Sequence, residues 1–309
     1  MKRTLFPAAI AAVVLLAACG SDPKVAGEAP PLSTDVVTTQ ATAAPTATTG
    51  PAAQHIVSLS PTGTEMLFAI GAGAQVIAVD DQSNYPPEAF DRKHDLSGYQ
   101  PNVEAIAALK PDLVVIGDDS SGISGQLEGI GLHTWVGEAA TSFDQVYDQI
   151  EQLGAATGHV AEAAEVVMKM QTDIDEAVKS APKPATPLTY YHELDNTYYS
   201  ITENTFIGQV YGLFGLQSIA DFEEVSSDYP QLSAEAVISA DPDFIFLADG
   251  GFGESPETVA ARPGWSSLKA VTGGNVIVVD ADISSRWGPR IVDYINEISA
   301  AIGKVVAAG

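Results

Sequence analysis

The chain contains one passage twice, and this duplication constrains the fold more than any other feature of the sequence. Residues 102–119, NVEAIAALKPDLVVIGDD, return without a gap as residues 233–250, SAEAVISADPDFIFLADG. In each copy a capping residue, Asn102 or Ser233, starts a short helix. A Pro-Asp pair ends it, and an apolar run of strand length follows. The two copies start 131 residues apart. Solenoid repeats recur every ~20 to 50 residues, so the much longer spacing here predicts two similar lobes.

Each apolar run stops at an aspartate, Asp118 in the first copy and Asp249 in the second. Elsewhere strand patterns alternate with short helical patterns, which is typical of parallel sheets built from right-handed crossovers. The predicted fold class is therefore α/β, with two Rossmann-like lobes. Ligands bind at the carboxyl ends of strands in such sheets, so we expect a cleft between the lobes.

A longer helical pattern separates the lobes. It begins near Phe143 and is clearest from His159 to Ser180, before Pro182 and Pro184 stop it. A helix of ~22 residues is ~33 Å long, enough to run across both lobes. We predict a single long helix that joins the lobes and allows only modest opening of the cleft.

Several local assignments depend on weaker patterns. We predict a short strand near Asp95–Ser97 and a hairpin that pairs residues 188–194 with residues 198–202. We also predict a loop over residues 281–288 and a closing helix that runs from Pro289 to about Val306.

The N-terminus reads as a secretory signal, with Met1-Lys2-Arg3 ahead of an apolar stretch too short to span a membrane. Its end, LAACG at residues 16–20, resembles the bacterial lipobox, which implies lipidation of Cys19. Residues 21–53 are rich in Thr, Ala and Pro, as in a flexible tether. We therefore expect an extracytoplasmic protein that touches the membrane only through its lipid anchor.

The predicted organisation is a signal peptide over residues 1–18, a lipidated cysteine and tether over 19–53, an N-terminal lobe over 54–142, a helical linker over 143–183 and a C-terminal lobe over 184–309.

The charge balance and the missing motifs exclude several function classes. Fourteen basic and forty acidic residues give a net charge of −26, which argues against nucleic acid as a partner. Gly122-Ile-Ser-Gly125 lacks the spacing of a nucleophile elbow, and Gly71-Ala-Gly73 precedes a strand where a dinucleotide site would follow one. The five histidines lack metal-ligand spacing. We expect no enzymatic activity, no metal site and no cofactor.

Several polar and aromatic residues fall where a cleft wall is expected. Ser60, Pro61 and Thr62 lie where a strand meets a helix N-terminus, so their N–H groups and hydroxyls could meet ligand oxygens. A guanidinium beside a broad aromatic ring suits a large, flat, amide-rich or anionic ligand. The other predicted ligand-binding residues are Tyr85, Tyr99, His192, Tyr199, Phe252, Arg286 and Trp287.

From His55 to about Ile302 the chain resembles the periplasmic binding proteins of ABC importers that capture metal chelates, namely cobalamin, ferric siderophores and haem. The resemblance implies two α/β lobes joined by one long helix. A loop like Ser285-Arg286-Trp287 and an aromatic near Tyr99 make it closest to the cobalamin-binding branch. The matching residues are 56–61 with Thr64-Glu65, 85–87, 102–104 with 109–113, Phe206, 233–235 with Pro242-Asp243, and 286–290.

The resemblance also implies partners. One exposed glutamate on each lobe, Glu104 and Glu235 by motif, would dock onto arginines of an ABC permease dimer with its ATPase subunits. The alternative is local, because a first-turn carboxylate is favoured by ~0.3–1 kcal/mol through the helix dipole. We expect a monomer whose ligand is the metal chelate.

The chelate stays open at this point: a corrinoid is favoured, and a ferric siderophore comes next. Haem would need an axial ligand, for which Tyr99, Tyr198, Tyr199 and His192 are candidates. A secreted enzyme that uses carboxylates such as Asp118 and Asp249 is the alternative from another class. Free metal-ion capture would require clustered ligands that the sequence does not offer.

Overall fold

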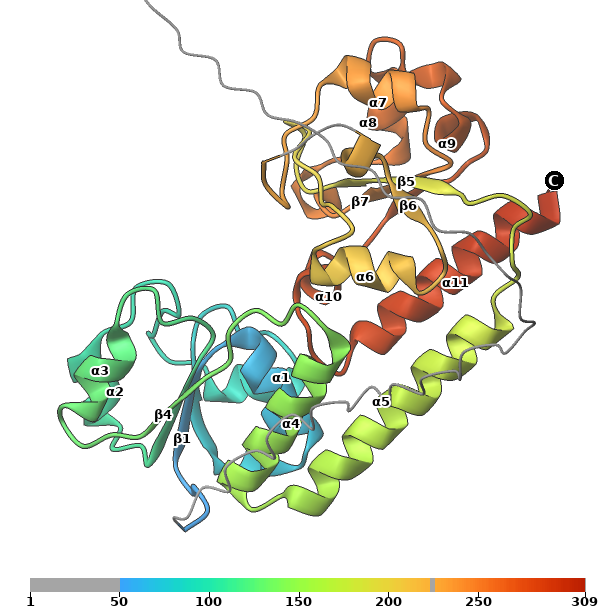
Figure 1. Cartoon of the computed structure of the whole chain (residues 1–309). Coiled ribbons are helices and arrows are strands. Elements are labelled where there is room, and N and C mark those ends of the chain that lie inside the picture. The colour runs from blue at the N-terminus through green and yellow to red at the C-terminus, as the bar shows by residue number, and fades with distance from the viewer. Residues whose placement is uncertain (1–50, 223–225, 309) are drawn as a thin grey trace, which may run out of the picture. The chain divides into compact units, whose positions relative to one another are not determined.

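A computed structural model describes residues 51–222 and 226–308 (Figure 1). The predicted signal peptide, Cys19 and all but the last residues of the tether lie outside the described residues. Within the described ranges, no helix combines the length and the apolar character needed to cross a bilayer.

The first sheet is parallel, with strand order β2-β1-β3-β4. Its strand order places β1 and β3 at the centre, and both are buried along their whole length. The elements are β1 (Ile56–Leu59), α1 (Pro61–Ala69), β2 (Val76–Val79), α2 (Val103–Ala108), β3 (Leu113–Ile116), α3 (Ile123–Glu128) and β4 (Thr134–Val136).

The second sheet is also parallel, and its order β6-β5-β7-β8 repeats that of the first. The prediction of two similar α/β lobes is therefore confirmed. The elements are β5 (Thr189–Glu193), α6 (Phe206–Gly212), β6 (Gln217–Ser218), α7 (Ala234–Ala240), β7 (Phe244–Leu247), α8 (Pro256–Ala261), α9 (Lys269–Thr272), β8 (Val276–Val278), α10 (Ala281–Ser285) and α11 (Ile291–Ala308).

The duplicated passage forms the same structure in both lobes. Asn102 caps α2 and Ser233 caps α7 through their side-chain oxygens, as predicted. The aspartate of each Pro-Asp pair then binds the start of the central strand. Asp112 accepts the backbone N–H of His55 at 2.9 Å, and Asp243 accepts that of Thr189 at 2.9 Å. Each repeat thus ties its own helix–strand unit to the first strand of its lobe.

Two helices connect the lobes. α4 (Phe143–Thr157) ends at Gly158, whose left-handed φ of 81° suits a glycine, and α5 (Val160–Ser180) follows. α4 packs against α1 of the first lobe, while α5 packs against both α4 and α11, as Figure 1 shows. The long helix α5 therefore lies between α4, which packs on the first lobe, and α11, the last helix of the chain.

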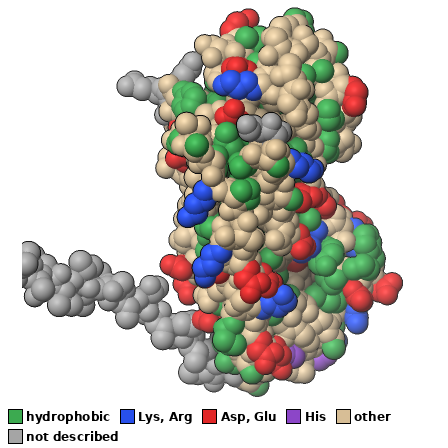
Figure 2. Space-filling view, turned by 90° about the vertical axis from the view of Figure 1, so that its right-hand side faces the viewer, with side chains coloured by type: hydrophobic (Ala, Val, Ile, Leu, Met, Phe, Trp, Pro, Cys, Tyr) green, Lys and Arg blue, Asp and Glu red, His purple; other side chains and the backbone are tan. Residues whose placement is uncertain are grey.

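The apolar core is continuous between the lobes. Its largest cluster contains Ile56 and Met66 of the first lobe, Met170 of α5, and Tyr190 and Ile295 of the second. Two smaller clusters pack β1 and β3 against α2 and α3 in the first lobe, and β5 and β7 against α7–α9 in the second. On the face in Figure 2, acidic and basic side chains are scattered among uncharged ones.

Three local predictions are wrong. Residues 95–97 form no strand, and nearby only Lys93 makes an isolated bridge. Residues 198–202 form no second strand of a hairpin: the Tyr199 carbonyl accepts the N–H of Leu194 at 2.9 Å, but Tyr199 bridges Gln231 and Thr202 donates its N–H to Asp228. Residues 281–285 are helical because the Asp280 carboxylate caps α10, and α11 begins after Pro289, at Ile291.

The two copies of the repeat differ at their last aspartate. Asp118 is exposed and accepts the N–H and hydroxyl of Ser120. Asp249 is only 3% exposed, and among the described residues neither of its carboxyl oxygens has a hydrogen-bond partner. Burial and the nearby Glu193 carboxylate raise the pKa of Asp249 to about 7. The same local sequence thus produces an exposed carboxylate and a buried one.

Asp249 should make the protein less stable as the pH rises. The unfolded chain releases this proton near pH 4 and the folded chain near pH 7, so stability is lost between these values. We expect the free energy of unfolding to fall between pH 5 and pH 8 by ~2 kcal/mol more in the wild type than in Asp249→Asn. Urea denaturation at both pH values measures this. Asp118→Asn is the matched control and should behave like the wild type. An equal fall in the free energy of unfolding between the two pH values in all three proteins would contradict the assignment.

Candidate ligand-binding cleft

Two cavities adjoin at the carboxyl ends of the two sheets. One, of about 450 Å³, is lined mainly by the second lobe, and the other, of about 380 Å³, mainly by the first. Ser285 and Trp287 line both cavities. The cleft expected from the strand ends is therefore present, and the segment between α10 and α11 separates its two halves.

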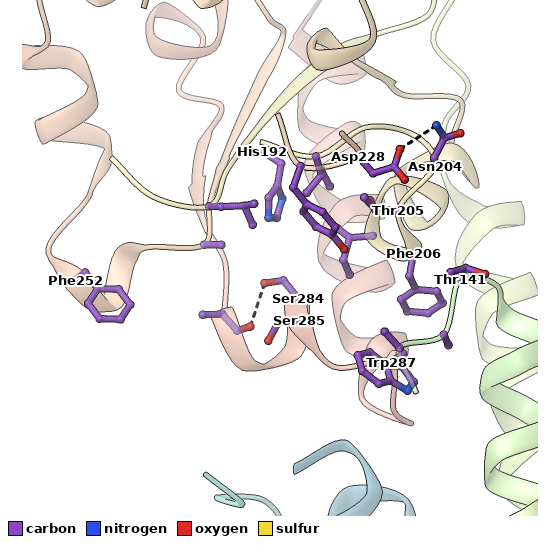
Figure 3. Close-up of a pocket in the computed structure, with 18 residues that line it drawn as sticks. Thr141, His192, Asn204, Thr205, Phe206, Asp228, Phe252, Ser284, Ser285 and Trp287 are labelled. Atoms are coloured by element: carbon purple, nitrogen blue, oxygen red, sulfur yellow. Dashed lines mark hydrogen bonds between the residues drawn. The ribbon is translucent and has the colours of Figure 1, made fainter. Parts of the chain in front are cut away.

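The second-lobe cavity is largely apolar (Figure 3). Asn204 and Asp228, hydrogen-bonded at 3.2 Å, form a polar edge. Phe252 is 92% exposed and lies at the margin of the group in Figure 3. The hydrophobic residues that line the cavity include Leu194, Ile201, Phe206, Ile207, Ala248 and Trp287.

His192 lines the second-lobe cavity from the end of β5 and is 1% exposed. Its Nδ1 lies 2.8 Å from the Tyr211 hydroxyl, which is hydrogen-bonded in turn to the hydroxyl of Tyr294. Burial lowers the pKa of His192 to about 4. The imidazole is therefore neutral at physiological pH, and its orientation is fixed by the two tyrosines.

The turn between β1 and α1 forms part of the first-lobe cavity, as predicted for Ser60, Pro61 and Thr62. The Ser60 hydroxyl accepts the N–H of Gly63 at 3.0 Å, so it caps α1. Tyr99 lines the same cavity and is 83% exposed. Its ring is therefore available to a ligand, whereas the Ser60 hydroxyl already has a partner.

The first-lobe cavity carries an excess of negative groups. Asp80, Asp118 and Asp282 line it, and Arg286 is the only cationic side chain among its described lining residues. Asp80 is 1% exposed; its Oδ1 accepts the N–H of Ser83, and its Oδ2 has no partner among the described residues. Burial raises the pKa of Asp80.

Arg286 lines the first-lobe cavity, and its guanidinium also has partners within the protein. Its guanidinium donates to Glu65 at 2.8 Å, to Asn84 at 2.7 Å and to Asp282 at 2.8 Å, and it is 9% exposed. Its charge is thus neutralised within the protein. Trp287, in contrast, donates only its Nε1–H to Gln149 and presents its ring to both cavities.

Tyr85 and Tyr199 lie apart from the two cavities. Tyr85 lines a separate depression beside Arg290, whose guanidinium lies 4.1 Å from the centre of the ring. Tyr199 is 40% exposed and lines neither half of the cleft. Tyr85 was predicted on a loop and Tyr199 on a strand, and in neither case could the sequence give the direction of the side chain.

Several residues that line the cleft were not among the predicted ligand-binding residues, including Asp80, Phe206 and Ser285. Asp80 directly follows β2, so the strand-end signal that selected Asp118 applied to it equally. Phe206 starts α6 after the cap Thr205 and faces the second-lobe cavity. Ser285 adjoins the predicted pair Arg286 and Trp287.

Glu104 and Glu235 occupy matching places outside the cleft. Both are exposed, and each lies in the first turn of its helix, α2 or α7. In the described part of the chain, no group of three or more His, Cys, Asp or Glu side chains is arranged to hold a metal ion.

The chain is similar to known binding proteins over its whole folded part. The family model described as periplasmic binding protein matches residues 56–283. An uncharacterized ABC transporter substrate-binding lipoprotein of Bacillus subtilis, YvrC, is 29% identical over 97% of each chain. A cobalamin-binding protein of Halobacterium salinarum is 31% identical over 80% of this chain and 69% of its own.

Among solved structures, the periplasmic vitamin B12 binding protein of Vibrio cholerae has a TM-score of 0.67 and 25% sequence identity. The match covers 81% of this chain and 97% of that one. The chain therefore belongs to the periplasmic binding protein family, and it is a substrate-binding component of an ABC transporter rather than an enzyme.

Proposed function

We propose that the protein captures a corrinoid of the cobalamin type in its cleft and delivers it to an ABC permease. The observation that carries this choice is the charge of the cleft. Asp80, Asp118 and Asp228 line its two halves without a salt-bridge partner among the described residues, and Arg286, the one cation among the described lining residues, is paired with Glu65 and Asp282. The corrinoid is the ligand, and we propose no resident cofactor or metal.

This charge pattern discriminates between chelates. A carboxylate or catecholate that enters the cleft loses its hydration and meets like charges, which costs several kcal/mol without a cationic partner. Haem bears two propionates, and tricatecholate siderophores carry a high negative charge. Corrinoids instead carry neutral amides, whose N–H groups can donate to carboxylates such as Asp118.

The second-lobe cavity supports the same ligand class. Phe206, Ile207 and Trp287 offer apolar and aromatic surface, and a few polar groups border it. Such a combination is usual in small-molecule sites, where apolar contact supplies affinity and a few polar groups fix orientation. A large ligand with apolar and amide-bearing parts would use both halves of the cleft.

Haem is the second candidate, because of one specific observation. The neutral imidazole of His192 lines the second-lobe cavity, and its Nδ1 is held by Tyr211. A neutral, oriented imidazole is a good axial ligand for iron. The absence of a free cation for the propionates among the described lining residues argues against this candidate.

Titration of the purified protein with four chelates tests the proposal. The set is cyanocobalamin, haem, a neutral or cationic ferric hydroxamate and an anionic ferric tricatecholate, with binding followed by calorimetry and by quenching of tryptophan emission. We expect cyanocobalamin to bind most tightly and the tricatecholate least. Tightest binding of haem or of the tricatecholate would refute the charge argument.

Trp287→Ala should weaken cyanocobalamin binding by ~10- to 100-fold, because a central aromatic side chain often contributes ~2 kcal/mol or more. Trp135→Phe is the matched control. The Trp135 indole is half-buried, hydrogen-bonded to Gln152, and lines neither half of the cleft. Equal affinities of the two variants would place the ligand elsewhere.

We propose that the protein acts as a monomer and docks onto two permease subunits through Glu104 and Glu235. Their matching exposed positions on the two lobes support this role. Changing both to lysine should abolish uptake and leave chelate affinity unchanged. Glu162→Lys is the control, because Glu162 also lies in a first helical turn, in α5, and loses the same dipole interaction. Uptake that survives the double reversal would reject the docking role.

We propose, from the lipobox-like LAACG motif, that a lipid on Cys19 anchors the protein to the extracytoplasmic face of the cell membrane. Cys19→Ser should move the protein from the membrane fraction to the soluble extracytoplasmic fraction, because a protein without its lipid loses the apolar contact with the bilayer. Immunoblotting of the fractions measures this. Retention of Cys19→Ser at the membrane would contradict the anchor.

A further inference from the structure

A buried ion cluster joins the two lobes beside the cleft. It consists of Glu65 and Asn84 from the first lobe and of Asp282, Arg286 and Arg290 from the second, and we call it the Glu65 clasp. Glu65 comes from α1 and Asp282 from α10, while Arg286 and Arg290 lie on the segment between α10 and α11. Glu65 is thus more than two hundred residues from Arg286 and Arg290 in sequence.

Glu65 is the centre of the clasp. Its Oε1 accepts from Arg286 Nη1 at 2.8 Å and from Arg290 Nη2, and its Oε2 accepts from Arg290 Nε at 2.8 Å. Arg286 also donates to Asn84 Oδ1 and Asp282 Oδ1, and Asn84 donates to Asp282 Oδ2 at 2.6 Å. The hydrogen bonds therefore form a closed network across the boundary between the lobes.

The centre of the clasp is shielded from water, whereas the side chain of Asp282 at its edge is 41% exposed. The side chain of Glu65 is 2% exposed, and those of Arg286 and Arg290 are 10% and 14% exposed. A buried charge that loses its partner is strongly destabilised, because no water replaces the lost interaction. Separation of the lobes at this point would leave Glu65 and Arg290 without a salt-bridge partner and Arg286 with Asp282 alone, until water enters, so the clasp resists opening.

The clasp also determines where the cleft residues lie. Arg286 is flanked by Ser285 and Trp287, the two side chains that line both cavities. Trp287 is tied to α4 through Gln149 at 2.9 Å. The segment with Ser285 and Trp287, which separates the two cavities, is thus held in place by Glu65 of the first lobe and by Gln149 of α4.

We infer that Glu65, Arg286 and Arg290 are positioning residues that set the separation of the lobes and retain the chelate by holding the lobes together. Each lobe has its own sheet and its own additional core cluster, so the clasp is not needed to build either lobe. The clasp instead affects the distance between the lobes. The part of the inference that concerns retention rests on the proposed function; the part that concerns lobe separation does not.

The test of lobe separation needs no ligand. In a Cys19→Ser background, which removes the only natural cysteine, Lys110→Cys and Lys269→Cys place one spin label on an exposed site of each lobe. Pulsed electron spin resonance then measures the distance distribution between the labels. Glu65→Gln, which keeps the shape but removes the charge, should widen this distribution, whereas Glu88→Gln, an exposed glutamate in the same lobe, should not.

Asn84→Ala is the milder second variant and should widen the distance distribution less. It keeps the test valid if Glu65→Gln does not fold. A distribution that remains unchanged in a folded Glu65→Gln protein, or in Asn84→Ala where only that variant folds, overturns the inference, whatever the chelate experiments show.

The test of retention compares dissociation rates. Labelled cyanocobalamin, displaced by an excess of unlabelled cyanocobalamin, should dissociate from Glu65→Gln at least ten times faster than from Glu88→Gln. The association rates of the two variants should differ by less than about threefold. Equal dissociation rates together with a widened distribution would overturn the role in retention. Failure of both the wild type and Glu88→Gln to bind any chelate would refute the proposed function instead, and the label distances would still decide the clasp.

Discussion

The arrangement of the cleft depends on one continuous apolar core that runs from the first lobe through α4, α5 and α11 into the second. Burial of apolar surface is the main favourable term in folding, and close packing makes such an interior resist deformation. Because both sheets contribute to this core, it keeps the carboxyl ends of their strands near one another, and the clasp sets their separation beside the cleft. The cavities that adjoin at Ser285 and Trp287 follow from this packing.

Charge is placed in two different ways around this core. At the clasp, Arg286 and Arg290 neutralise Glu65 and hold the lobes together. In the cavities, Asp80 and Asp118 have no cationic partner in a salt bridge among the described residues, so ligands that carry donors are favoured over anions. Arg286 belongs to both the clasp and the cleft. It lines the first-lobe cavity, and its guanidinium donates hydrogen bonds to Glu65 and Asp282 within the protein.

Much of the fold could be read from the sequence because its signals are local. Asn102 and Ser233 cap helices through their own neighbours, and the apolar runs after Pro111 and Pro242 have the length of strands. The strand-end rule correctly placed Ser60, Pro61 and Thr62 at a cavity. It did not place Tyr85, which lines a separate depression, because a loop residue's direction depends on contacts with distant segments, such as that of Arg290 with Tyr85.

The sequence by itself determined the duplication, the α/β class and the candidate strand ends, since periodicity and capping act over a few residues. Only the tertiary structure decided which charges are free. Asp118 and Asp249 close equivalent repeats, yet one is exposed and the other is buried next to Glu193, a residue on the neighbouring strand. Likewise Arg286 is bound by Glu65, a partner that no local pattern identifies. Burial and long-range pairing depend on the packing of the whole chain, and the packing converts similar sequences into different chemistry.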